Sequence, residues 1–267
     1  EYPIRFDFLD TIGGQNLSLQ VHPLTEYIHR NYGMAYTQDE SYYILDAEDD
    51  ACVYIGLKEG VDKEAMERDL RSAEKGEMIF DAEKYVNKVP VKKHDHILIP
   101  AGTVHCSGKN AMVLEISATP YIFTFKLWDW GRVGLDGLPR PIHIDHGMKN
   151  IEWNRTTSWV MENIANNIKT LEEKDDYKKE VTGLHELEFI ETERYTTSTF
   201  FDVEMTDSVQ QLNLVEGKSA LIESLDGSFP PFEVHYAESF IIPSSVKKYR
   251  VRSTGGEIKV VAAFVRN

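Results

Sequence analysis

The segment from Leu17 to Pro23 alternates strictly between apolar and polar side chains. Its apolar members are Leu17, Leu19 and Val21, and its polar members are Ser18, Gln20 and His22. A period of two residues is typical of a β-strand, so Gln20 and His22 project from the same face. Either that face is exposed to solvent, or it lines the mouth of a barrel and binds a ligand. The choice depends on which other ligand-type residues the chain supplies.

Two further ligand-type residues lie downstream. Glu40 stands in the β-rich run from Asp39 to Leu45, and His105 follows a turn that contains Pro100 and Gly102. A tight turn of this kind places the histidine after it on a barrel strand, facing inward. We therefore predict that Glu40 and His105 join the polar face of the first segment.

Together the four residues offer two imidazoles, one carboxylate and one amide oxygen: Gln20, His22, Glu40 and His105. Nitrogen and oxygen ligands without a thiolate suit Zn²⁺ or a similar first-row ion, and they leave positions open for water or substrate. A lone histidine at a strand end is more often an ordinary polar residue. Because the four residues occupy separate motifs, we predict a divalent metal site.

The spacing of these residues also matches two signatures of the cupin barrel. His94, five residues, and then Pro100-x-Gly102-x-x-His105 match the second signature, except that His94 replaces its leading glycine. The segment from Gly14 to His22 fits the first signature, with Gln20 in place of its first histidine. These matches predict a cupin barrel in the N-terminal half of the chain.

Four motifs in order resemble the type I mannose-6-phosphate isomerases: Gln20-Val21-His22-Pro23, Glu40-x-Tyr42-Tyr43-Ile44-Leu45, Pro100-x-Gly102-Thr103-x-His105 and Lys126-Leu127-Trp128-Asp129-Trp130-Gly131-Arg132. The resemblance covers residues 3–150 well and the C-terminal half only as a degenerate second cupin. It implies that Gln20, His22, Glu40 and His105 hold zinc, one ion per chain. It also implies interconversion of mannose 6-phosphate and fructose 6-phosphate through a cis-enediol, with a sugar phosphate as the small-molecule partner.

In such an isomerase the metal and a nearby cation stabilise the developing oxyanion, and a side chain moves the proton. Lys126 and Arg132 lie six residues apart on a strand-like stretch, and we predict them as the catalytic cations, facing one way. The family carries arginine where this chain has Lys126, and lysine where it has Gln38. The run from Ile116 to Pro120 also departs from the family pattern.

These departures leave a second hypothesis, a non-catalytic metal- and sugar-binding cupin that has lost the isomerase activity. The complete ligand set opposes it. A metal-dependent oxygenase is a third hypothesis, but Gln20 takes a place that a third histidine often fills in cupin oxygenases, and this favours Lewis-acid chemistry.

For the whole chain we predict an all-β fold of two cupin-type (double-stranded β-helix, jelly-roll) barrels with helical insertions. Residues 1–144 would form the metal-binding cupin domain, residues 145–182 a helical or linker segment, and residues 183–267 a degenerate cupin-like β domain. Within the first domain, residues 61–86 predict two helices with Asp62 as N-cap and a break near Gly76.

Composition limits the partners and the compartment. The 267 residues carry a net charge of −15, so we expect no nucleic-acid partner. Only Cys52 and Cys106 are present, which fits a reducing cytoplasm. No run of about 18 apolar residues occurs, so we expect no membrane span. The chain begins at Glu1, already within a predicted strand, and we expect an N-terminal part to be absent. The oligomeric state is left open.

Overall fold

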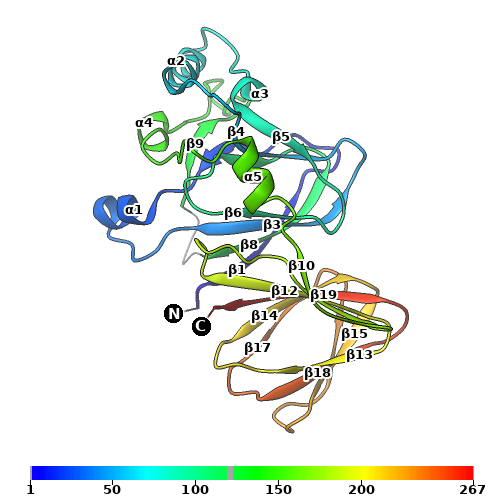
Figure 1. The fold of residues 1–267 in the computed structure, drawn as a ribbon. Helices are drawn as coiled ribbons and strands as arrows, with labels where there is room; N and C mark the ends of the chain where they lie inside the picture. Colours follow the sequence, from blue (N-terminus) through cyan, green and yellow to red (C-terminus); the bar gives the residue numbers. More distant parts are fainter. Residues whose placement is uncertain (1, 119–122, 267) are drawn as a thin grey trace. The chain divides into compact units, whose positions relative to one another are not determined.

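The computed structural model describes residues 2–118 and 123–266. The chain divides into two compact units, Glu1–Asn166 and Asn167–Asn267 (Figure 1). Each unit is built around antiparallel sheets. No helix in the described parts of the chain is long and apolar enough to cross a membrane.

The first unit contains two antiparallel sheets. One has the order β1 (Ile4–Asp10), β8 (Ala111–Ala118), β3 (Asp39–Ala47) and β6 (His96–Ile99). The other has the order β5 (Val86–Pro90), β4 (Cys52–Leu57), β7 (His105–Ser107), β2 (Leu19–Val21) and β9 (Phe125–Trp128). Apolar residues from both sheets form one core cluster, so the sheets pack face to face.

Helices pack against the second sheet, most of them on its outer side. The helices of this unit are α1 (Thr25–Tyr32), α2 (Lys63–Glu74), α3 (Ala82–Tyr85), α4 (Ile144–Gly147) and α5 (Thr157–Asn163). The Asp62 side chain accepts a hydrogen bond from the Ala65 amide (2.9 Å), and Gly76 adopts a positive φ beyond the end of α2. The predicted pair of helices with a break between them is thus confirmed. Met66 and Leu70 of α2 are fully buried in the same cluster as Leu19 of β2, and Figure 1 shows α2, α3 and α4 on that side.

A β-bulge interrupts the pairing of β2 with β9. Gln20 pairs with Lys126 and Leu19 pairs with Trp128, so Leu127 is the extra residue on β9. Cross-strand partners project from the same face. Lys126 therefore shares the inner face with Gln20, whereas Trp128 shares the outer, helix-covered face with Leu19.

The second unit also contains two antiparallel sheets. The larger has the order β10 (Lys169–Lys174), β11 (Tyr177–Val181), β12 (Ile190–Thr197), β19 (Ile258–Val265), β14 (Gln210–Glu216) and β17 (Ser239–Ile242). The smaller has the order β13 (Phe200–Glu204), β18 (Lys248–Ser253), β15 (Ser219–Ser224) and β16 (Phe232–His235). A single buried cluster draws on both sheets.

The division between the units falls inside the segment 145–182, which sequence predicts to be helical or a linker. Its first part contributes α4 and α5 to the first unit. Its second part is a correction, because residues 169–181 form the hairpin β10–β11. All six residues of β10 are exposed. The strand therefore has no buried face, and its sequence lacks the alternation of apolar and polar residues that would predict a strand.

Candidate metal centre

Three side chains from three different strand regions converge inside the first unit. His22 follows the end of β2, Glu40 lies in β3 and His105 opens β7. Nε2 of His22 is 3.1 Å from Oε2 of Glu40, and Nε2 of His105 is 2.9 Å from Oε1 of the same carboxylate. All three residues are buried, with at most 2% of their surface exposed. One ligand atom from each lies within 4.8 Å of the others.

The second nitrogen of each imidazole fixes its orientation. Nδ1 of His22 donates to the carbonyl of Phe123 (2.9 Å), and Nδ1 of His105 donates to the carbonyl of Thr103 (2.8 Å). In this tautomer Nε2 of each ring carries a free lone pair. Backbone carbonyls that hold the outer nitrogen of a histidine are the usual support of a metal ligand.

The geometry between these groups fits a metal better than a hydrogen-bond network. Nε2 of His22 and Oε1 of Glu40 are buried and have no hydrogen-bond partner of acceptable geometry among the described residues. Buried polar atoms are rarely left in this state. A donor set of imidazole nitrogens and a carboxylate suits Zn²⁺ or another first-row divalent ion.

The side chain of Gln20 also lies at the cluster of His22, Glu40 and His105. It pairs with His105 across β2 and β7, and its amide nitrogen lies 3.2 Å from Nε2 of His105. Rotation of the amide by half a turn presents its oxygen instead. The structure therefore brings together all four predicted ligand residues.

The charges of the cluster reinforce one another. Burial raises the pKa of Glu40, but His22 and His105 beside it outweigh that effect and hold the pKa well below its usual value. Burial lowers the pKa of His22, and the Glu40 carboxylate more than offsets this, so the His22 pKa is raised. Glu40 is thus an ionised acceptor at neutral pH.

A cavity of about 230 Å³ opens onto the cluster and exposes residues that the sequence reasoning missed. Besides Gln20 and His22, its wall includes Glu115 and Arg5, which form an ion pair of 3.1 Å. Burial and the nearby Glu40 raise the pKa of Glu115 to about 8. The pair joins β1 to β8 across 110 positions of sequence, so no local motif reveals it.

No protein-family model matches the chain. It is 32% identical over 153 residues to the mannose-6-phosphate isomerase ManA of Bacillus subtilis, covering 57% of this chain and 44% of that protein. It is 22% identical over 266 residues to a mannose-6-phosphate isomerase of Streptococcus mutans, covering 98% of this chain and 74% of that protein. The chain is thus similar in sequence to mannose-6-phosphate isomerases.

Solved structures show the same fold. The mannose 6-phosphate isomerase of B. subtilis superposes with a TM-score of 0.77 at 19% identity, covering 98% of this chain and 75% of that one. A putative mannosephosphate isomerase of Archaeoglobus fulgidus gives a TM-score of 0.70 at 16% identity, covering 100% of this chain and 73% of that one. The predicted all-β fold of the mannose-6-phosphate isomerases is confirmed. The chain spans less than half the length of the B. subtilis protein that it matches at 32% identity.

The two cations predicted from the isomerase resemblance do not meet in one cavity. Lys126 lies opposite Gln20, and its ammonium group makes no ion pair or hydrogen bond with the residues that the structure describes. Arg132 pairs with Asp129 and donates to the carbonyl of Asn16 (3.0 Å). It lines a different cavity, on the outer side of β9.

The expectation that both cations face one way therefore does not hold, because β9 ends at Trp128. Beyond it Trp130 and Gly131 adopt positive φ, so the strand period does not extend to Arg132. Two positions of the altered run from Ile116 to Pro120, Thr119 and Pro120, lie outside the described residues.

Proposed function

We propose that the chain is a zinc-dependent aldose–ketose isomerase that interconverts mannose 6-phosphate and fructose 6-phosphate through a cis-enediol. The observation that carries the proposal is the convergence of buried His22, Glu40 and His105, with unpartnered atoms on His22 and Glu40, within the fold of the mannose-6-phosphate isomerases. Gln20 completes the proposed ligand set. When bound, Zn²⁺ or a similar ion would act as a Lewis acid toward the sugar oxygens.

The remaining chemistry is assigned to Lys126 and to Glu115, a residue of the cavity wall. Lys126 is the cation proposed to stabilise the enediolate, because it shares the inner face with Gln20 and its ammonium group has no described partner. Glu115 is proposed to move the proton between C1 and C2, since it is a buried carboxyl in the wall of the cavity and belongs to none of the ligand positions. Lys126 keeps the positive charge of the arginine that the family has at this position. Its ammonium group is a compact charge and lacks the forked donors of a guanidinium.

Arg132 is proposed to act indirectly, through Asp129 and Ser18, without contacting the substrate. It holds Asp129, whose Oδ1 also accepts the hydroxyl of Ser18 at 2.7 Å. Ser18 lines the cavity beside the metal cluster. By this path Arg132 would fix the rim of the substrate site. We also propose a cytoplasmic location, which the free and buried Cys52 and Cys106 support.

The test is a coupled assay for fructose 6-phosphate formed from mannose 6-phosphate by protein reconstituted with zinc. Glu40→Ala is the blank, and metal content is measured on both proteins. Turnover that exceeds the blank, together with loss of zinc from Glu40→Ala and His105→Ala, supports the proposal. His235→Ala, an exposed histidine of the second unit, is the matched control and should keep the zinc. Zinc retained in both ligand variants contradicts the ligand assignment, and absence of turnover with zinc bound contradicts the isomerase.

A further inference from the structure

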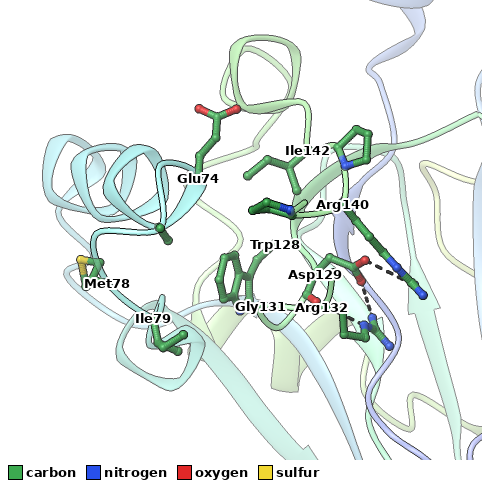
Figure 2. Close-up of a pocket in the computed structure, with 13 residues that line it drawn as sticks. Glu74, Met78, Ile79, Trp128, Asp129, Gly131, Arg132, Arg140 and Ile142 are labelled. Carbon is green, nitrogen blue, oxygen red and sulfur yellow. Dashed lines mark hydrogen bonds and ion pairs between the residues drawn. The ribbon is translucent and has the colours of Figure 1, made fainter. Parts of the chain in front are cut away.

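A second cavity of about 600 Å³ lies in the first unit, on the outer side of β9. It is formed by the segment that follows α2 and by the segment between β9 and α4 (Figure 2). It shares no lining residue with the cavity at the metal cluster. Its volume falls in the range typical of small-molecule sites.

Most of the wall of this outer cavity is apolar. Met78 and Ile79 stand on one side, and Trp128 and Ile142 stand across from them (Figure 2). Ile79 is 74% exposed, although it borders a concave apolar surface. An occupant with an apolar body would remove this area from water, at about 25 cal/mol per Å².

The other end of the cavity carries an unbalanced group of charges. Asp129, which is 3% exposed, lies between Arg132 and Arg140, and Figure 2 shows both guanidinium groups directed toward it. One carboxylate therefore faces two guanidinium groups, which leaves a local excess of one positive charge. The chain as a whole carries a net charge of −15. Glu74, the other acidic residue of the wall, is on α2 and points away from this group.

Arg140 is the arginine left available to a ligand. Its Nη1 is 3.6 Å from Oδ2 of Asp129, beyond hydrogen-bond distance, and this is the one contact recorded for its guanidinium among the described residues. Its side chain is half exposed. Oδ2 of Asp129 and the indole N–H of Trp128 are also buried without hydrogen-bond partners in the described structure. A site built only for packing would not leave two buried polar groups, on Asp129 and Trp128, without partners.

We propose that this outer cavity binds a small organic anion with an apolar body, a site separate from the metal centre. The acid group pairs with Arg140, whose guanidinium offers the forked donors that carboxylate, sulfonate or phosphate oxygens accept. The apolar body lies between Ile79 and Trp128. The inference does not depend on the isomerase activity.

The first experiment uses the full chain and two fluorescent probes of similar size. The probe 8-anilinonaphthalene-1-sulfonate has an apolar body and an anionic group, and N-phenyl-1-naphthylamine has the apolar body alone. The native protein should bind the sulfonate at one site. Arg140→Gln should raise its Kd about tenfold or more, as expected for loss of a charge-assisted contact, and should leave the neutral probe unaffected. Arg68→Gln, an exposed arginine of α2, is the matched control and should bind both probes as the native protein does.

A second measurement titrates the native protein and needs a variant only to assign one signal. The chain has four tryptophans, so the indole N–H region of its nitrogen–proton spectrum holds few signals, and Trp128→Phe assigns one of them. Titration with the sulfonate should shift the Trp128 signal with the same Kd as the fluorescence. An unmoved Trp128 signal, equal sulfonate affinity in Arg140→Gln and native protein, or no saturable binding would each overturn the proposal.

Discussion

The side-chain amide of Gln38 donates to Oε2 of Glu40 across 2.9 Å, and its carbonyl oxygen accepts the backbone N–H of Phe123 at 3.0 Å. The carbonyl of Phe123 in turn accepts Nδ1 of His22. Gln38 therefore connects two proposed metal ligands through one buried side chain. This glutamine stands where the isomerase family has lysine, and the structure gives it a contact of its own with the carboxylate.

Replacing Gln38 by leucine should weaken metal binding. The substitution keeps the volume but removes one donor to Oε2 of Glu40 and leaves the N–H of Phe123 without its acceptor, which costs about 1–3 kcal/mol of stability. Loss of such a supporting contact lowers metal affinity about 10–100-fold. Competition with a zinc chelator measures the affinity. Gln38→Lys keeps a donor toward Glu40 and should fall between leucine and the native residue; equal affinity in all three proteins would refute the role of Gln38.

Replacing Arg155 by methionine should loosen the turn that precedes His105. Nη1 of this buried arginine donates to the carbonyls of Pro100 (2.6 Å) and Ala101 (2.7 Å). Gly102, at φ +89°, closes the same turn, where a Cβ would come within 2.8 Å of Leu24. We expect Arg155→Met to lower both the melting temperature and the zinc affinity, because His105 loses its fixed position.

Arg155→Lys is the matched control for that change. It keeps one charged donor and should recover part of the zinc affinity. A lower melting temperature with unchanged zinc affinity would show that Arg155 supports only the fold.

Replacing Lys126 by methionine should lower kcat and leave the bound zinc in place. The ammonium group is proposed to stabilise charge that develops only during the reaction, so its loss should reduce kcat more than it raises KM. We expect a decrease of about 100-fold or more, as for loss of one oxyanion donor. Lys126→Arg, which restores the residue of the family, should retain most of the activity. A methionine variant with native kcat would exclude Lys126 from catalysis.

The carboxyl of Asp129 should make the first unit sensitive to acid. Burial raises its pKa, but hydrogen bonds from Ser18 and Arg132 outweigh burial and hold the pKa below its ordinary value of 3.8. A lowered pKa in the folded state stabilises the protein above the unfolded value, and this contribution is lost as pH falls through the folded value. Asp129→Asn should therefore melt at a lower temperature than the native protein at pH 7, and the difference should shrink below about pH 4. Thermal unfolding at pH 7 and pH 3 checks this, and a constant difference would contradict it.

Much of the convergence at the candidate metal centre was predictable because its signals are local. The alternation from Leu17 to Val21 places Gln20 on the inner face, and the Pro100–Gly102 turn places His105. The ion pair of Arg5 with Glu115 was not predictable, since its partners belong to strands that meet only in the folded unit. The hairpin β10–β11 was missed for a different reason, because exposed strands carry no apolar period.

The bulge at Leu127 lets one short strand serve two compartments. Without it, Lys126 and Trp128 would share a face, as residues two apart in a regular strand do. With it, Lys126 lies on the side of the metal centre and Trp128 on the side of the outer cavity. The separation of Lys126 and Trp128 onto opposite faces of β9 depends on the one extra residue in the strand and not on the chemistry of its side chains. Evolution can therefore vary either wall of β9 by substitution, but regular pairing of the same residues, without the bulge, would turn Trp128 toward the side of the metal cluster.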